Sequence, residues 1–584
     1  MLLVIEMRLR INVNKDGSRN LYVMQSYRNS SGVSTTKIVE KLGSYDELKK
    51  LHPDPIAWAK QYIAELNVQS DEERRIISVD FDPAAQLDLN DRRFFNGGYL
   101  YLQKIYYDLR LDYICSRISA RYKFDYSLND ILRTMVFGRI LFPASKLGTY
   151  EQSANLIERP SFELHDIYRA LEVIAQETNF IQRELYRHSK KIAKRNDKIL
   201  YYDCTNYFFE IERESGIRQY GMSKEHRPNP IVEMGLFMDG DGIPLAFDIT
   251  SGNTSEQKTM IPIERQIIEE FGNAQFVVCT DAGLSSYVNR KFNSIGNCAY
   301  ITTQSVKKMK AHIRQWCLSP QGWKISESRQ TFDIAEIMAN EMLKEQYYET
   351  VFYKERWINE NGLEERIIVS FNVKYAEYTK ALRNEQLCRA VKAIRNHTVD
   401  RTRETDCKRF IKHCAVTKDG EIAEKNVYAI DEERIFEEEQ YDGIYAVATN
   451  LEDPVEDVIA VNKGRWEIEE SFRIMKNEFK ARPVYLSRDN RIKAHFTTCF
   501  IALTVFRYME KYLDHKYSCR QIIEGLQKMN FLLVDSDGYI PTYTRTAFTD
   551  DLHTRFPFRT DKQIISKKSM RKIISQSKTA ERTT

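Results

Sequence analysis

The chain has 584 residues, of which 42% are hydrophobic and 29% charged. This composition is typical of globular proteins and excludes collagen, a long coiled coil and wholesale disorder, while the length predicts about three or four domains. The 87 basic and 83 acidic residues leave a net charge of +4, which neither indicates nor excludes a nucleic-acid partner, because one face can be basic while another is acidic.

Cysteine usage and hydropathy favour an intracellular protein. The ten cysteines include no Cys-x-x-Cys pair, which argues against a zinc module or a disulfide scaffold and fits a reducing cytosol. The first residues, MLLVIEMRLRINV, lack the pattern of a signal peptide. No segment approaches the roughly 20 apolar residues of a membrane span. We therefore expect a cytoplasmic protein without a membrane partner.

Residues 1–80 predict a small β-containing unit. Alternating apolar and polar residues over Leu21–Tyr27 and Thr36–Leu42 indicate strands, and a helix is expected near Pro55–Leu66. Residues 81–197 are rich in helices. Ser127 as a cap and Pro143 as a stop predict one helix over Leu128–Leu141, and Ile167–Ile174 has the same periodicity.

Residues 198–302 change to an α/β pattern. Three strand-like runs, KILYYDCTNYFFE, IVEMGLFM and IPLAFDIT, come first, and Asp239-Gly240-Asp241-Gly242 predicts a hairpin between the last two. The order then continues as helix Ser255–Phe271, strand Gln275–Thr280, helix Ser285–Phe292 and strand Cys298–Thr302. An antiparallel meander followed by crossover units is the order of a ribonuclease-H-like α/β core.

A β-rich insertion is predicted for residues 303–450, with strands such as Arg366–Val373 and Gly443–Thr449 and a helix around Leu382–Arg395. Residues 451–515 complete the core with one long helix, Pro454–Phe479, and an amphipathic helix, Arg491–Tyr512. Residues 516–584 form a basic C-terminal region. Its basic residues could bind phosphates, although a solvated tail is the commoner explanation.

Two aspartates stand where strands place functional groups. Asp203 lies inside an apolar strand, and Asp281 ends another, FVVCT. A buried carboxylate is costly unless it is paired or binds a metal, and functional groups gather at the carboxyl ends of strands in α/β sheets. For each residue alone, a structural role in an ion pair or a helix cap is the stronger alternative.

A stripe of polar residues strengthens the functional interpretation. In AVNKGRWEIEESFRIMK, Asn462, Arg465, Glu469 and Lys476 are spaced 3, 4 and 7 positions apart, so they are expected to project from one side of one helix. Glu469 would complete a metal site while Arg465 and Lys476 bind phosphates. An exposed helix with ion pairs between successive turns is the alternative.

The segments YYDCTN, VVCTDAG and RWEIEESFRIMK together resemble the DDE transposases of bacterial insertion sequences. The resemblance is greatest to the group with a Tyr-x2-Arg-x3-Glu-x6-Lys signature on the helix of the last carboxylate, although Asn462 stands in the tyrosine position. The intervals of 78 residues from Asp203 to Asp281 and 188 from Asp281 to Glu469 also fit this group, which carries a β-rich insertion before its glutamate.

The resemblance implies a catalytic triad of Asp203, Asp281 and Glu469 that holds two Mg²⁺ ions, with Mn²⁺ as a substitute. Such ions activate water or a DNA 3′-hydroxyl and stabilise the leaving oxygen. It also implies that Asn462, Arg465 and Lys476 contact DNA. Lys224 and Arg227 could do the same, with an ordinary loop as the equal alternative.

Trp316 and Trp323, in the insertion, are expected to be core residues, with a wedge against a flipped base as the alternative. By elimination, residues 81–197 become the candidate DNA-end-binding domain, although a helical scaffold fits equally well.

The expected function is cut-and-paste transposition by metal-dependent end cleavage and strand transfer. The implied partners are double-stranded DNA, as terminal inverted repeats and target, and further copies of the chain in a dimer or larger synaptic complex. The protein would be cytoplasmic and nucleoid-associated in a bacterium or archaeon. Another ribonuclease-H-like nuclease or recombinase, and an inactive DNA-binding relic, remain alternatives.

Overall fold

The computed structural model describes residues 7–14, 17–28, 34–74, 84, 86, 89, 91–326, 328–399, 406–416, 422–534 and 537–580. Two compact units are present. The smaller consists of Met1–Arg93, Phe531–Pro541 and Thr560–Lys572, and the larger of Phe94–Asn530, Thr542–Arg559 and Ile573–Thr584. In the described part of the chain, no helix is long and apolar enough to cross a bilayer.

The smaller unit contains a three-stranded antiparallel sheet in the order β1–β2–β3, which confirms the predicted strands. Its elements are β1 (Met7–Val13), β2 (Arg19–Arg28), β3 (Ser34–Ser44), α1 (Tyr45–Leu51) and α2 (Pro55–Arg74). The helix α2 runs past the predicted end at Leu66. Leu21, Leu48 and Ala59 form the core beneath the sheet. The unit also takes in the antiparallel pair β15 (Asn530–Val534) and β16 (Gly538–Pro541).

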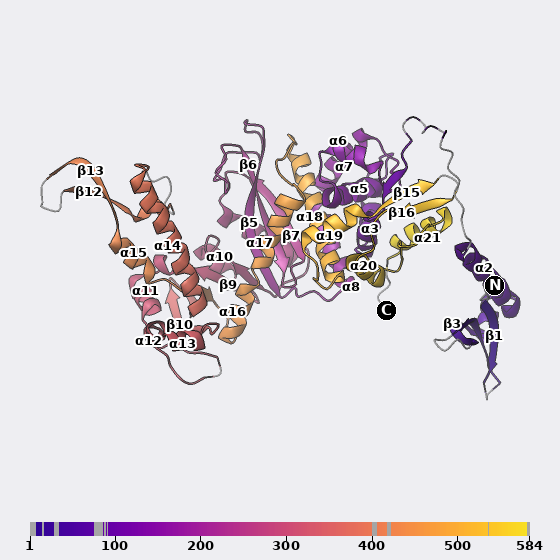
Figure 1. The fold of residues 1–584 in the computed structure, drawn as a ribbon, viewed down its shortest axis with the longest axis horizontal. Helices are drawn as coiled ribbons and strands as arrows, with labels where there is room; N and C mark the ends of the chain where they lie inside the picture. The colour runs from indigo at the N-terminus through magenta and orange to yellow at the C-terminus, as the bar shows by residue number, and fades with distance from the viewer. Residues whose placement is uncertain are drawn as a thin grey trace. The chain divides into compact units, whose positions relative to one another are not determined.

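The larger unit begins with short β4 (Phe94–Asn96) and a helical region. The helices are α3 (Tyr99–Asp108), α4 (Leu111–Ser119), α5 (Leu128–Leu141), α6 (Lys146–Ser153), α7 (Leu164–Gln176) and α8 (Thr178–Ile192). The Ser127 hydroxyl accepts a hydrogen bond from the Asp130 amide at 3.2 Å, so the predicted cap of α5 is confirmed. Helix α18 (Asp489–Tyr512) packs against α3, α5 and α7 and also against the sheet strand β7 (Figure 1).

An eight-stranded sheet forms the centre of the larger unit, in the order β10-β11-β14-β9-β8-β5-β6-β7. The strands β5 (Ile199–Phe208), β6 (Ile231–Asp239) and β7 (Pro244–Ser251) form an antiparallel meander, while β8 (Val277–Thr280) and β9 (Ala299–Gln304) run parallel to β5. The 3-10 turn η1 (Glu256–Lys258), α9 (Met260–Glu269) and α10 (Tyr287–Phe292) connect them. The predicted order of strands and helices is confirmed.

The segment predicted to be a β-rich insertion is a mixture of helices and strands. It contains η2 (Val306–Lys308), α11 (Ala311–Leu318), α12 (Ile334–Ala339), α13 (Glu341–Gln346), β10 (Phe352–Glu360), β11 (Leu363–Phe371), α14 (Val373–Arg395), η3 (Cys407–Phe410), β12 (Ile411–Val416), β13 (Ile422–Ile430), α15 (Glu432–Glu439) and β14 (Ile444–Thr449). Because β14 pairs antiparallel with β9, with Ala448 opposite Thr302, three of its strands extend the central sheet. Trp323 is fully buried in the core of this segment and Trp316 packs against that core, as expected.

The single long helix predicted over Pro454–Phe479 is wrong. The chain forms α16 (Val455–Lys463), α17 (Trp466–Arg473) and a π-helical turn, η4 (Ile474–Glu478). Gly464 separates the first two. A Cβ atom at Gly464 would lie 2.1 Å from the Tyr201 hydroxyl oxygen, and that hydroxyl donates a hydrogen bond to the carbonyl of Val461 at 3.0 Å. Tyr201 of β5 therefore occupies the break, which only glycine admits. The remaining elements are α19 (Cys519–Lys528), α20 (Ala547–Arg555) and α21 (Lys567–Ser577).

A buried ion pair fixes the hairpin between β6 and β7. Arg195 Nε donates to Asp239 Oδ2 at 2.6 Å, and both side chains are at most 1% exposed. The other Asp239 oxygen accepts from the amides of Asp241 and Ile243 at 3.1 and 2.9 Å. Removal of either charged partner would leave the other buried and uncompensated.

Glu264 on α9 makes stability depend on pH. Its Oε1 accepts a hydrogen bond from Asn293 Nδ2 at 2.8 Å, and burial raises the pKa of this carboxyl to about 8. Because the folded state holds the proton more tightly than the unfolded state, the stabilisation is complete below about pH 4.5 and is lost as the pH rises towards 8. Glu264→Gln should therefore raise Tm relative to wild type by at least roughly 2 °C more at pH 8 than at pH 5.

Thermal unfolding followed by circular dichroism at the two pH values measures this difference. Glu269→Gln, an exposed position on the same helix, is the control and should show no such dependence. Equal effects of Glu264→Gln at both pH values would contradict the assignment.

Candidate active site

Asp203 lies in the middle of β5, and Asp281 directly follows the end of β8, the parallel neighbour of β5. The register of β5 and β8 pairs Ile199 with Val277 and Tyr201 with Cys279. The same offset separates the two aspartates, so continuing the register by two residues places Asp203 beside Asp281. Side chains opposite one another in this way project from the same face of a sheet. The sheet therefore brings the two carboxylates close to one another.

Burial and like charge make this pair of carboxylates costly. Burial, with the nearby Asp281 carboxylate, raises the pKa of Asp203 to about 6 despite the opposing effect of Lys224. Asp203 Oδ1 accepts the amide of Cys204 at 2.7 Å, and Asp281 Oδ1 accepts the amide of Leu284 at 3.0 Å. Each keeps its other oxygen available. Such a pair attracts a cation.

Three cationic side chains surround Asp203. Lys224 Nζ forms an ion pair with Glu256 at 2.8 Å and donates to the carbonyl of Cys204. Lys476 Nζ donates to the Thr205 hydroxyl, and Arg465 Nη1 donates to the Thr303 hydroxyl at 3.2 Å. Burial and the neighbouring Lys224 lower the pKa of Lys476 to about 8. The face of β5 that carries Asp203 is thus covered by the helical segments that carry Arg465 and Lys476.

Glu469 is not brought to the two aspartates in this conformation. Its side chain is 65% exposed on α17, with Arg465 Nη2 at 3.6 Å. The carboxylate oxygens of Asp203, Asp281 and Glu469 do not all lie within 4.8 Å of one another. The neighbouring acids are occupied elsewhere, since Glu467 lies 3.5 Å from Arg507 and Glu470 pairs with Arg473.

The predicted stripe on one helix is wrong, because the chain breaks at Gly464 and places its members on α16, α17 and η4. Asn462, Arg465 and Glu469 nevertheless line the same cavity. Asn462 is buried on α16. It donates from Nδ2 to the Tyr445 hydroxyl at 3.0 Å and accepts a hydrogen bond from Cys279 Sγ at 3.6 Å. The Thr303 hydroxyl, which accepts a hydrogen bond from Arg465, lies 2.7 Å from the Tyr445 hydroxyl, so Arg465 and Asn462 contact the same pair of hydroxyl groups.

The segment SKEHRPNP contains one residue at the site and one beside it. Lys224 contacts the Asp203 environment directly. Arg227 lies over the ring of Phe208, 4.2 Å from its centroid, and 3.5 Å from Glu225. The loop is therefore held against the end of β5, close to the aspartates.

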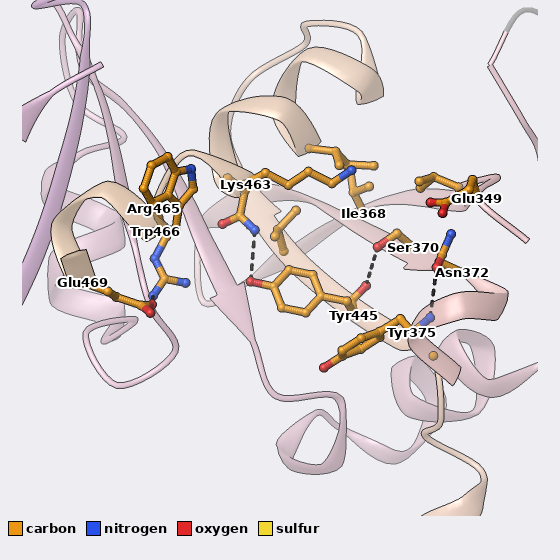
Figure 2. A pocket seen from close by; sticks show the side chains of 15 residues that line it. Glu349, Ile368, Ser370, Asn372, Tyr375, Tyr445, Lys463, Arg465, Trp466 and Glu469 are labelled. Atoms are coloured by element: carbon orange, nitrogen blue, oxygen red, sulfur yellow. Dashed lines mark hydrogen bonds and ion pairs between the residues drawn. The ribbon is translucent and has the colours of Figure 1, made fainter. Parts of the chain in front are cut away.

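A cavity of about 490 Å³ opens between β11, β14 and the helices α16 and α17. Figure 2 shows Arg465 and Glu469 together at one end, Glu349 at the other, and Tyr445 and Tyr375 between them. Trp466 and Lys463 also line it. Aromatic rings beside cationic groups suit a nucleobase with its phosphate. Sequence analysis missed Tyr375 and Tyr445, because no local pattern indicates that the inserted strands join the sheet.

Two further acids near the site, Glu233 and Glu256, were also not predicted from the sequence. Glu233 on β6 is buried and accepts from Asn206 Nδ2 at 3.4 Å, and burial, with the nearby Glu256, raises its pKa to about 7. The signal for Glu233 was present: like Asp203, it is a lone acid within an apolar strand, IVEMGLFM.

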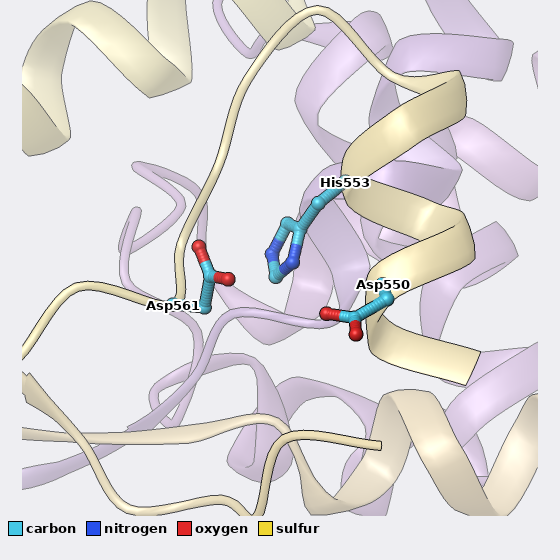
Figure 3. A group of neighbouring side chains, drawn as sticks. All are labelled: Asp550, His553 and Asp561. Atoms are coloured by element: carbon cyan, nitrogen blue, oxygen red, sulfur yellow. The ribbon is translucent and has the colours of Figure 1, made fainter. Parts of the chain in front are cut away.

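A third group of side chains lies away from this site. Asp550 and His553 are one turn apart on α20, and Figure 3 shows them projecting from the same side of that helix. Arg545 Nε donates to Asp550 Oδ1 at 2.6 Å, so this carboxylate already has a counter-charge. Asp561, also drawn, belongs to the smaller unit. None of the three belongs to the candidate active site.

Comparisons with known proteins bear on this geometry. A solved structure of a piggyBac transposase synaptic complex with hairpin DNA is 8% identical to the chain, with a TM-score of 0.35, and covers 84% of this chain and 88% of that one. No curated protein matches the chain. The family model described as a transposase DDE domain matches residues 208–505, a little more than half of the chain. The match includes Asp281 and Glu469 and begins just after Asp203. The chain therefore belongs to the transposase DDE domain family.

Proposed function

We propose that this DDE transposase moves an insertion sequence by a cut-and-paste route, with Asp203, Asp281 and Glu469 as its catalytic carboxylates. The observation that supports this most is the parallel register that sets Asp203 beside Asp281. The Arg465, Glu469 and Lys476 spacing favours the insertion-sequence group named above, with Asn462 as the departure from its signature.

The donor set fits a divalent cation. Two carboxylates that share a buried position repel one another, and a hard cation with oxygen ligands such as Mg²⁺ or Mn²⁺ would neutralise that repulsion. Asp203, Asp281 and Glu469 would hold the ions. When bound, a pair of ions supplies Lewis-acid activation of the attacking and leaving oxygens.

The remaining side chains would bind and orient the DNA. Lys224, Lys476 and Arg465 present positive charge around Asp203 and would hold phosphates next to the scissile bond. Glu469 lies 3.6 Å from Arg465. Its helix, α17, packs on β5, the strand that carries Asp203. We propose that DNA binding draws Arg465 onto a phosphate and frees Glu469 to turn towards the aspartates.

The substrate would be double-stranded DNA, as terminal inverted repeats and target. Two ends would be held in a dimer or a larger synaptic complex in the cytoplasm of a bacterium or archaeon. The membership of the DDE family supports a DNA substrate, and the helical region packed on α18 is the proposed DNA-end-binding part.

Replacement of Asp281 separates DNA binding from catalysis. Asp281→Asn should lower metal-dependent nicking and strand transfer by more than roughly 100-fold, because even the loss of a group that supports a metal ligand costs 10–100-fold. The assay uses labelled DNA that carries the element's own end, with Mg²⁺, Mn²⁺ or EDTA. Specific binding should survive in the variant.

Two outcomes would contradict this proposal. Wild-type binding without cleavage under either metal would indicate an inactive relic. Degradation of any DNA without joined products would indicate a nuclease.

Glu467, two residues before Glu469 on the same helix, provides a matched control. Glu469→Gln should reduce cleavage as severely as Asp281→Asn, because it removes a proposed metal ligand. Glu467→Gln, on the same helix, loses only an ion pair with Arg507 and should keep activity within a few-fold of wild type. The cleavage rates of both variants at saturating Mg²⁺ measure the difference. If Glu467→Gln were the inactive variant, the assignment of the third carboxylate would be wrong.

A further inference from the structure

A second basic pocket lies next to the end of β5. It has a volume of about 300 Å³, and its lining includes Arg139 from α5, Lys146 from α6, and Lys480, Arg482 and His495. No aspartate or glutamate lines it. Arg482 forms an ion pair with Glu225, which does not line the pocket. The positive charge that remains in this concave site raises the local concentration of anions.

Lys146 is the central residue of this pocket. Its side chain lines the cavity, yet the residue is only 6% exposed, and neither an ion pair nor a hydrogen bond of its amine is found among the described residues. Burial and the nearby Arg139 lower the pKa of this amine to about 7. A buried ammonium without a counter-charge is unfavourable, so an anion in the pocket would stabilise it.

Arg139 and His495 hold the back of the pocket in place. Arg139 Nη1 donates to the carbonyl of Phe479 at 3.0 Å, and its Nη2 donates to the carbonyl of Ala144 at 3.3 Å. The His495 ring nitrogen Nε2 lies 3.1 Å from the carbonyl of Ala481. Burial, with Arg139 and Lys146 nearby, lowers the pKa of His495 well below its usual range. The positive charge of the pocket therefore comes from the arginines and lysines.

The pocket is connected to the candidate active site by β5 itself. Phe209, which directly follows β5, bridges to Val484 of the pocket wall. Arg482 pairs with Glu225, the neighbour of Lys224. Asp203 and Phe209 are six positions apart along an extended chain. The distance between them is therefore about 20 Å, which corresponds to roughly six base pairs of duplex at 3.4 Å each. One DNA segment could therefore reach both places.

We propose that Arg139, Lys146 and the rim residues Lys480 and Arg482 form a binding site for a phosphate group, supplied by the backbone of the DNA strand that enters the active site. DNA as the source of the phosphate rests on the proposed function, whereas the phosphate site itself does not. Water occupies about 30 Å³ per molecule, so the pocket has room for a phosphate with its attached sugar. Tyr485, 69% exposed at the rim, is placed to cover that sugar.

The test replaces the buried amine by an apolar side chain of similar shape. Lys146→Met should fold at least as well as wild type, because it removes an uncompensated buried charge. In EDTA at about pH 6, where the amine is protonated, it should bind end DNA roughly tenfold more weakly. The slope of log K against log salt should also fall by about one.

Two further variants keep the test decisive. Lys480→Gln, at an exposed rim position, should lower affinity by a smaller factor without touching the core. Lys392→Gln removes an equally charged, exposed lysine on α14, outside the parts proposed to bind DNA, and should leave the affinity and the salt slope unchanged.

Inorganic phosphate distinguishes the source of the anion. Phosphate should raise the wild-type Tm above that in chloride at equal ionic strength, and Lys146→Met should lose this shift. A phosphate shift lost in Lys146→Met with an unchanged DNA salt slope would overturn DNA as the source. If Lys146→Met altered neither measurement, the site itself would be refuted. Wild type that binds phosphate but no DNA at all would refute the proposed function and leave the phosphate site standing.

Discussion

The repulsion between two partly buried carboxylates is the constraint on which the site depends. A parallel sheet fixes Asp203 and Asp281 at the same register, and partial burial weakens the screening of their charges by water. Cations from two stretches of the chain lie around the aspartates: Lys224 after β5, and Arg465 and Lys476 at the start of α17 and in η4, which are consecutive elements. These two stretches are far apart in sequence, so the larger unit must be folded as a whole before the aspartates are compensated.

Sequence patterns were sufficient wherever a signal is local. Alternation and turn residues predicted β5 to β9 in the correct order, and the cap at Ser127 located α5 because both features act within a few residues. The cost of burying a charge identified Asp203, and the same argument applied to IVEMGLFM would have identified Glu233. Lys224, predicted as a DNA contact, lies near Asp203, whereas its ion-pair partner Glu256 was not predicted.

The errors arose where contacts between residues far apart in sequence determine the local structure. A glycine within a helical pattern lowers helix stability by only about 1 kcal/mol, so Gly464 did not mark a break until Tyr201 was seen to occupy it. The misplacement of Asn462 follows from that break. Arg195 follows Lys190, Lys191 and Lys194 in the sequence, yet its side chain is buried in an ion pair with Asp239. In each case a tertiary contact overrides a periodicity that is correct within its own segment.

The pairing of β14 with β9 has a consequence for the order of events during synthesis. After β9 the chain forms β10 and β11, which join the central sheet through β14. The β9–β14 contact therefore joins residues far apart in sequence and forms slowly. Until the ribosome has released β14, the edge of β9 presents unpaired backbone groups that invite association with other chains. The compact helices and strands between them would shorten that exposure by collapsing early, which gives the intervening segment a role in biogenesis separate from any role at the DNA.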